Sequence, residues 1–156
     1  MILVGIDVAK DKHDCCIINS DGEFPEEVFS TLNNREGYET LYMQICSLAV
    51  DLAKVKVGLE STGHYSSNLL AFLLDKHLTA YVINPLRVNL FRKGQSLRRT
   101  KTDKIDSRNI AHLLMTDSSL KPYSLSSYHM EELKSLTRYR ASKVRFYSNQ
   151  TFVTHS

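Results

Sequence analysis

The stretch Ile2-Leu3-Val4-Gly5-Ile6-Asp7-Val8 opens the chain with an almost unbroken run of strand-forming residues that closes on a carboxylate. A run of this kind is typical of a strand buried on both faces, so we expect it near the centre of a sheet. Residues 12–19 predict its hairpin partner, and residues 27–32 predict a third strand. Together these segments predict an antiparallel meander with Asp7 near the middle of the sheet.

The segments that follow add parallel strands. Apolar residues at helical spacing run from Asn34 to Leu52, and a strand is predicted at residues 55–60. A helix at about residues 65–76 then leads to a strand at residues 79–83. The order strand, helix, strand predicts a right-handed parallel crossover. We therefore expect an α/β protein with a mixed sheet of about five strands flanked by helices.

A predicted helix that begins near Thr102 carries acid on its apolar side. At about 100° per residue, Asp103 and Asp106 fall on the stripe that Ile110 and Leu113 continue. One interpretation is that Thr102 caps the helix and that both acids only complement the positive end of the helix dipole. The other interpretation is that the acids face into the protein because they have a function there.

Two upstream carboxylates favour the second interpretation. Asp7 and Glu60 each close a strand that is predicted to be buried, and with Asp103 and Asp106 they would form a four-carboxylate cluster. Such a cluster repels itself unless cations are bound, and its oxygen ligands suit Mg²⁺ or Mn²⁺. Two ions about 4 Å apart would activate a water or hydroxyl group and stabilise the leaving oxygen of a phosphoryl transfer. The predicted chemistry is that of a nuclease or a transesterification enzyme.

Basic residues surround the acidic helix. The whole chain has a net charge of only +3, but residues 87–108 hold eight basic residues against two acidic ones. A solvated polar loop has the same composition, whereas next to a metal site this basicity predicts contacts to nucleic-acid phosphates. We expect Arg98, Arg99 and Lys101 to contribute most. The predicted nucleic-acid-binding residues are Arg87, Arg92, Lys93, Arg98, Arg99, Lys101, Lys104 and Arg108.

The C-terminal part departs from the α/β pattern. Residues 116–122 interrupt regular structure, and a helix is predicted from near Ser127 to about Tyr147. We expect a catalytic domain over residues 1–117 and a helical extension over residues 118–156, the start of a truncated linker or coiled-coil region.

The cysteines and the hydropathy of the chain indicate the cellular compartment in which it works. The three cysteines include no CxxC pair and are expected to be reduced and mostly buried. No apolar run approaches the roughly 20 residues of a membrane span, so we expect a cytoplasmic protein with no membrane partner.

Four motifs occur in a fixed order along the chain: Gly5-Ile6-Asp7-Val8-Ala9-Lys10, Glu60-Ser61-Thr62-Gly63-His64-Tyr65, Asn84-Pro85 and Lys101-Thr102-Asp103-Lys104-Ile105-Asp106. This set resembles the DEDD-type transposases of insertion-sequence family one hundred and ten, relatives of the Piv DNA invertases, over nearly the whole chain. The resemblance implies an RNase H-like, RuvC-type domain with a C-terminal helical arm. It also implies that two Mg²⁺ or Mn²⁺ ions are bound by the catalytic residues Asp7, Glu60, Asp103 and Asp106.

The resemblance further implies a function. Members of that family recombine DNA, some with a structured guide RNA, and normally carry a second, C-terminal domain whose serine takes part in strand cleavage. The chain is thus expected to be the catalytic domain of a DNA transposase or site-specific recombinase, incomplete without that domain. DNA is the implied partner, and the basic loop and final helix are implied to contact nucleic acid or other subunits of a homo-oligomer.

Several residues near Glu60 have two interpretations. His64 is a candidate contact to the scissile phosphate, although a loop histidine more often faces solvent. Tyr65 is expected to pack at the start of its helix and not to act as a nucleophile. Gly58 and Gly63 are expected to serve a strand end and a turn, respectively.

Two other functions stay open on sequence alone. The chain has the strand opening of one half of an actin-like or sugar-kinase ATPase, because Gly5-Ile6-Asp7 before a hairpin also suits that fold. The Gly-rich phosphate loops expected there are missing. The other alternative is a non-catalytic nucleic-acid-binding or assembly module whose acids only cap helices.

Overall fold

The computed structural model of the protein describes residues 1–21, 28–61, 63–95, 103–124, 134 and 136–140, with the side chains of residues 95 and 103–105 outside that description. Contacts divide the chain into two units, Met1–Tyr123 and Ser124–Ser156. The first unit extends to Tyr123, whose N–H donates to the carbonyl of Ala80 at 2.7 Å. The boundary expected after residue 117 stays a prediction.

In the second unit, Lys134 and residues 136–140 are helical. Most of the helix predicted over residues 127–147 lies outside the described residues. In the part of the chain that the structure describes, no helix combines the length and the apolar character needed to cross a membrane.

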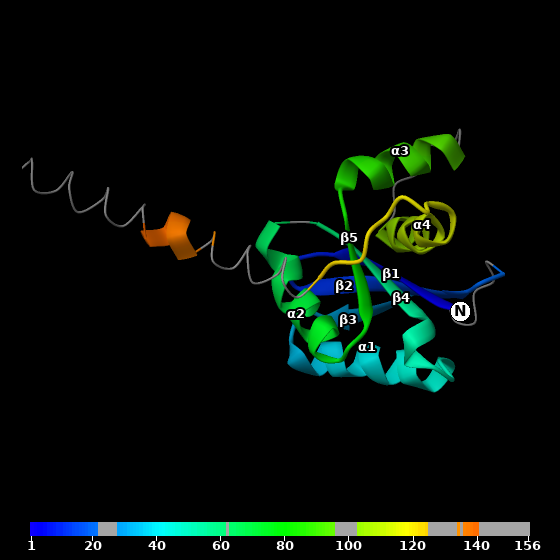
Figure 1. The fold of residues 1–156 in the computed structure, drawn as a ribbon, viewed down its shortest axis with the longest axis horizontal. Helices are drawn as coiled ribbons and strands as arrows, with labels where there is room; N and C mark the ends of the chain where they lie inside the picture. Colours follow the sequence, from blue (N-terminus) through cyan, green and yellow to red (C-terminus); the bar gives the residue numbers. More distant parts are fainter. Residues whose placement is uncertain (22–27, 62, 96–102, 125–133, 135, 141–156) are drawn as a thin grey trace, which may run out of the picture. The chain divides into compact units, whose positions relative to one another are not determined.

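Five strands form one mixed sheet in the order β3-β2-β1-β4-β5 (Figure 1). β1 (Ile2–Val8) pairs antiparallel with β2 (Lys12–Asn19), which pairs antiparallel with β3 (Phe29–Leu32). On its other side, β1 pairs in parallel with β4 (Val55–Glu60), and β4 pairs in parallel with β5 (Thr79–Ile83). β1 is therefore central, as its apolar composition predicts, and the expected mixed α/β sheet is confirmed.

Helices cover both faces of the sheet (Figure 1). α1 (Arg35–Leu48) and α2 (Ser67–Asp75) lie on one side, and α3 (Pro85–Gln95) and α4 (Asp103–Thr116) lie on the other. A 3₁₀ turn, η2 (Gly63–Ser66), precedes α2, and Gly63 has a φ of 58°, as a turn glycine predicts.

α1 begins at a polar cap and ends just before Ala49, where the backbone becomes extended. The side chain of Asn34 accepts a hydrogen bond from the N–H of Gly37 at 2.9 Å. The helix ends at Leu48 and not at the predicted Leu52, because Asp51 accepts from the N–H of Ala53 at 2.9 Å. That bond starts a separate 3₁₀ turn, η1 (Leu52–Lys54).

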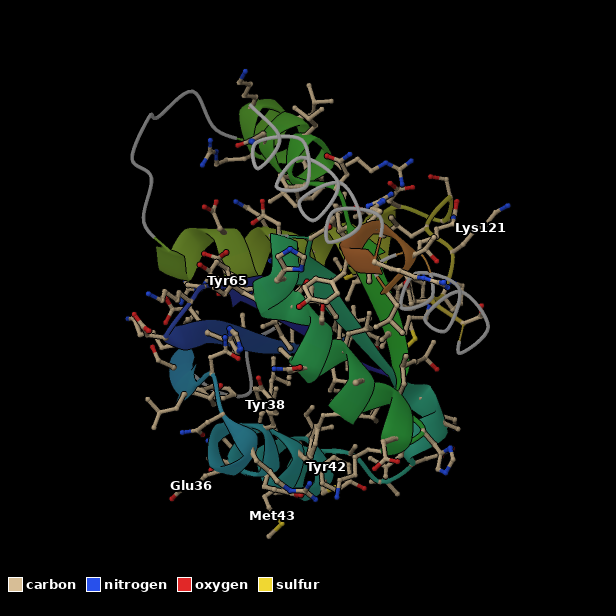
Figure 2. The ribbon with its side chains drawn as sticks, turned by 90° about the vertical axis from the view of Figure 1, so that its left-hand side faces the viewer. Glu36, Tyr38, Tyr42, Met43, Tyr65 and Lys121 are labelled. Atoms are coloured by element: carbon tan, nitrogen blue, oxygen red, sulfur yellow. The ribbon has the colours of Figure 1, made fainter. Side chains whose placement is uncertain are left out.

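Aromatic side chains fill the space between α1 and α2. Tyr38 and Tyr42 project from α1 toward α2, with ring centroids 5.6 and 6.4 Å from that of Phe72 (Figure 2). Met43, on the outer side of α1, points away from the protein (Figure 2). Tyr38 also stacks on His13 of β2 at 6.1 Å. This layer buries the face of the sheet opposite α4.

His13 is an ionisable group inside that layer. Its side chain is 0% exposed, and its Nδ1 accepts a hydrogen bond from the N–H of Ala9 at 3.3 Å. Nε2 has no hydrogen-bond partner among the described residues. Burial lowers the pKa of His13 from its ordinary value of 6.5, because the charged imidazolium would lose its hydration.

The other face of the sheet is shaped by two glycines beneath α4. Gly5 of β1 and Gly58 of β4 are direct neighbours in the parallel register. A Cβ on Gly5 would lie 2.0 Å from the carbonyl oxygen of Ser107 and 2.5 Å from the backbone nitrogen of Ala111. A Cβ on Gly58 would lie 2.9 Å from Cγ2 of Ile110 and 2.9 Å from Cδ1 of Leu114. The expectation that Gly58 serves a strand end is wrong, because it admits a helix to the middle of the sheet.

A hydrophobic core joins α4 to this face. It contains Leu3 of β1 and Cys16 and Ile18 of β2, together with buried residues of β5, α3 and α4. The buried α4 members are Ile110, Ala111, Leu113 and Leu114, which includes the apolar stripe expected for this helix.

Substitution of Gly5 by alanine is expected to lower the free energy of unfolding by about 3 kcal/mol, because the methyl group meets backbone atoms of α4 that cannot move independently. Gly94 of α3 is the control, since a Cβ there meets nothing within 4 Å. Gly94→Ala should raise stability by about 0.5–1 kcal/mol through helix propensity. Urea unfolding followed by circular dichroism measures both. Equal stability of the two variants would contradict the close packing of α4.

Stability should fall as pH drops below 6.5. The pKa of His13 is lowered in the folded protein, so the unfolded chain takes up the proton first. The stability is therefore complete above 6.5 and is lost between 6.5 and the lowered folded-state value, by up to about 1.4 kcal/mol per pH unit. His13→Gln should be less stable near neutral pH and should flatten this slope. His77→Asn, at an exposed position with a φ of 58° that asparagine tolerates, should keep it.

Candidate metal and nucleic-acid site

Two of the predicted acids lie side by side at the carboxyl ends of the central parallel strands. The last register pair of β1 and β4 joins Ile6 to Leu59, so Asp7 and Glu60 occupy the next positions. Side chains alternate along a strand, so Asp7 lies on the face that Gly5 presents to α4, and Glu60 lies on the same face as Gly58. Both residues are partly exposed. The fold therefore brings these two carboxylates to one face and one edge.

A third acid, Asp14, faces Asp7 from the antiparallel side. The register of β1 and β2 pairs Asp7 directly with Asp14, which shares the face of Cys16. Asp14 is 7% exposed; it accepts a hydrogen bond from Ser30 Oγ and lies 3.8 Å from Lys12 Nζ. Like charges directly opposite each other are unfavourable in a sheet, so this pair needs neutralising partners. Sequence analysis did not single out Asp14, although the hairpin register would have placed it opposite Asp7.

Asp106 lies on the helix that covers this face. It is 7% exposed, and its Oδ1 lies 3.4 Å from Nη1 of Arg92 on α3. Arg92 Nη2 also donates to Asn89 Oδ1 at 2.8 Å. The inward orientation that the stripe predicts for Asp106 is confirmed. Its ion pair with Arg92 is a long-range contact that the periodicity does not reveal.

The four-carboxylate cluster stays a prediction as a whole. Asp103 begins α4, but its side chain lies outside the described residues. Among the side chains that are described, no group of three or more His, Cys, Asp or Glu residues is placed to hold a metal ion. The donor set nevertheless fits a hard divalent cation in its chemistry, since it consists of carboxylate oxygens at one edge of the sheet and on the facing helix. The described members are Asp7, Glu60 and Asp106.

The predicted basic residues differ in what the structure describes of them. Arg87 lies 3.5 Å from Asp117 and donates to Ser119 at 2.8 Å, so its side chain is held at the carboxyl end of α4. Lys93 is exposed on α3. Arg108 is exposed on α4, and its positive charge lowers the pKa of the Cys16 thiol, against the larger effect of burial. Arg98, Arg99, Lys101 and the side chain of Lys104 lie outside the described residues.

The buried thiols are structural. Cys15 and Cys16 are free and fully buried, and Cys46 is partly buried, as expected for reduced cysteines. Burial raises the pKa of Cys15 to about 12 and that of Cys16 to about 11, because a thiolate would be poorly solvated there. Neither group is a nucleophile near neutral pH.

Two residues of the turn after Glu60 are open to solvent, His64 and Tyr65. His64 and Tyr65 belong to η2 and are exposed, Tyr65 to 47%. The expectation that Tyr65 packs at the start of its helix is wrong, because the 3₁₀ turn carries it outward before α2 begins. His64 is accessible, and its contact to a phosphate stays a prediction.

A sheet with three antiparallel and then two further parallel strands, crossed by α4, defines the RNase H-like class in its RuvC-type form. A solved structure with this fold is that of T. thermophilus RuvC in complex with Holliday junction substrate, with a TM-score of 0.53 at 11% identity. The match covers 79% of this chain and 99% of that one. The expected fold class is confirmed.

The chain belongs to the DEDD transposase family of insertion sequence IS110, whose profile, described as transposase, matches residues 4–152. Two relatives are the pilin gene-inverting proteins of Moraxella bovis and Moraxella lacunata, each 30% identical over 104 residues. The aligned region is 67% of this chain and 31% of each relative, so the chain spans about a third of the length of these proteins. The resemblance carried by the four sequence motifs is thereby confirmed.

Proposed function

We propose that this chain is the catalytic domain of a DNA transposase or site-specific recombinase that cleaves and joins DNA strands with divalent metal ions. The observation that carries the proposal is the placement of Asp7 and Glu60 at adjacent positions on one face, under the helix that carries Asp106. Family membership and the RuvC-type fold support the same conclusion.

In this proposal, Asp7, Glu60, Asp103 and Asp106 hold two Mg²⁺ or Mn²⁺ ions. The bound ions would supply an activated water or hydroxyl nucleophile and charge stabilisation for the leaving oxygen of an in-line displacement. The sheet contributes rigidity, since Asp7 and Glu60 are anchored in its two central parallel strands. Asp106 is held on a helix whose position is set by glycine contacts, and rigid elements position ligands more accurately than loops.

The basic segment beside this site is proposed to bind the DNA backbone. Arg98, Arg99 and Lys101 lie in the chain between α3 and α4, and Lys93 and Arg108 are exposed on those helices. His64, exposed in the turn after Glu60, is proposed to contact the scissile phosphate. Arg87 is paired with Asp117, and its contact to DNA stays a prediction.

Assembly and completeness of the enzyme are part of the proposal. Leu136 and Tyr139, at helical spacing in the second unit, are 60% and 63% exposed and offer apolar surface for pairing of subunits. A further C-terminal domain that takes part in strand cleavage is proposed on family grounds. A structured guide RNA is proposed as a second nucleic-acid partner on family grounds.

One observation favours the non-catalytic alternative. Asp106 has a basic partner in Arg92, and an acid in an ion pair can serve packing alone. In that case the chain would bind nucleic acid or assemble without metal. Nothing in the described residues favours the ATPase alternative.

Manganese binding tests the catalytic proposal. Calorimetric titration of the chain with Mn²⁺ should show binding that Asp7→Asn or Glu60→Gln weakens at least about tenfold, since even outer-shell partners of a metal cost that much. Asp75→Asn is the matched control because it removes the same charge from an exposed position at the end of α2. Manganese-soaked crystals should show anomalous peaks beside Asp7. Absence of binding, with salt-sensitive DNA binding retained, would establish the non-catalytic alternative instead.

DNA affinity should depend on the segment between α3 and α4. Replacing Arg98, Arg99 and Lys101 together with glutamine should weaken binding at low salt and reduce the slope of log affinity against log salt by about 2–3, because each lost phosphate contact removes about 0.9. Fluorescence anisotropy with a labelled duplex measures both quantities. The control is a triple glutamine variant of three exposed basic residues elsewhere, Arg35, Lys54 and Lys121. An equal effect of the two triple variants would refute the proposed DNA surface.

A further inference from the structure

We propose that Arg92 is a built-in substitute for the metal at Asp106, so that binding of a divalent ion must displace its guanidinium group. This inference rests on the proposed function, because it concerns regulation of the same carboxylate site. It starts from the ion pair between Arg92 Nη1 and Asp106 Oδ1, which are 3.4 Å apart.

The carboxylate of Asp106 requires a positively charged partner. Its side chain is only 11% exposed, so water solvates the carboxylate poorly. Asp106 is also carried on the helix that packs over the face of the sheet shared by Asp7 and Glu60. Without a positive partner, a buried carboxylate on the helix that covers this face is strongly disfavoured.

The contact between Arg92 and Asp106 is weak enough for a metal ion to displace it. Charge-assisted N–H···O bonds are usually about 2.7–2.9 Å long, and arginine often binds a carboxylate through two parallel bonds. The contact here is longer, at 3.4 Å, and joins one nitrogen to one oxygen. The other terminal nitrogen, Nη2, donates to Asn89 Oδ1 at 2.8 Å on the same helix. The guanidinium therefore keeps a partner on α3 when it leaves Asp106.

The guanidinium of Arg92 and a divalent metal ion cannot both bind the Asp106 carboxylate fully. A divalent ion bound to Asp106 would lie within a few ångströms of the guanidinium, and like charges at this distance repel in a partly buried site. Arg92 is 27% exposed, so its side chain has a route to solvent once released. Arg92 thus stabilises the metal-free protein and lowers its affinity for the ion.

The same helix provides a matched control in Arg87. Arg87 pairs with Asp117 at 3.5 Å and with Ser119, at the opposite end of α4 from Asp106. Loss of Arg87 removes the same charge and one ion pair between α3 and the residue that follows α4, but leaves Asp106 untouched. An effect on metal binding that appears only with Arg92 is therefore specific to its contact with Asp106.

The experiment compares Mn²⁺ binding by calorimetry for the wild-type chain, Arg92→Gln, Arg92→Lys and Arg87→Gln. Arg92→Gln should bind Mn²⁺ roughly three- to tenfold more tightly than wild type, because a nearby positive charge is lost. Its Tm without metal should be lower, with the difference reduced at saturating Mn²⁺. Arg92→Lys, which keeps the charge, and Arg87→Gln should bind like wild type. Unchanged or weaker binding by Arg92→Gln would overturn the inference while leaving the proposed function intact.

Magnetic resonance of the Arg92 guanidinium is a second measurement. It uses the wild-type chain, so it does not depend on the folding of a variant. Titration of isotope-labelled wild-type chain with Mg²⁺ should shift the Arg92 side-chain Nε–H resonance in step with the binding isotherm, while that of Arg87 stays in place. Binding of Mg²⁺ with an unmoved Arg92 resonance would overturn the inference. Absence of any binding of Mn²⁺ or Mg²⁺ by wild type would overturn the proposed function and this inference together.

Discussion

The close approach of α4 to the centre of the sheet is the constraint on which the rest of the structure depends. It is permitted by Gly5 and Gly58, neighbours on the two central parallel strands, where any side chain would collide with the helix. Because the helix lies directly on the backbone of β1, its apolar stripe completes the core on that face. The same contact carries Asp106 over the face on which Asp7 and Glu60 lie. A candidate site is thus assembled by packing, and not by a loop.

Charge is the second organising feature, and it follows from the first. The sheet register sets Asp7 opposite Asp14 and beside Glu60, so acids accumulate at one edge of one face. Positive side chains around this edge form ion pairs with the acids: Lys12 lies near Asp14, and Arg92 of α3 pairs with Asp106. A protein that concentrates carboxylates for catalysis needs such counter-charges whenever its cations are absent. In the proposed function, divalent ions would replace these positive side chains at the acidic edge.

The strands and helices themselves were predicted well from residues close in sequence, whereas the ends of two elements were not. The nearly continuous apolar run of β1 and the helical stripe ending at Leu113 are local signals, and both elements occur as expected. The end of α1 was predicted too late, because the cap formed by Asp51 competes with the continuing apolar pattern. Tyr65 was predicted to be packed but is exposed, since nothing local distinguishes a 3₁₀ turn from the start of α2.

The sequence by itself determined the α/β class, the central place of the first strand and the identity of the acids that close strands or interrupt an apolar stripe. Each of these follows from composition and periodicity along a single element. Only the tertiary structure decided that Gly58 is a helix contact, that Asp14 faces Asp7 and that Arg92 pairs with Asp106. Those relations join elements far apart in the chain, and a register or a helix contact exists only once the sheet and α4 have packed together.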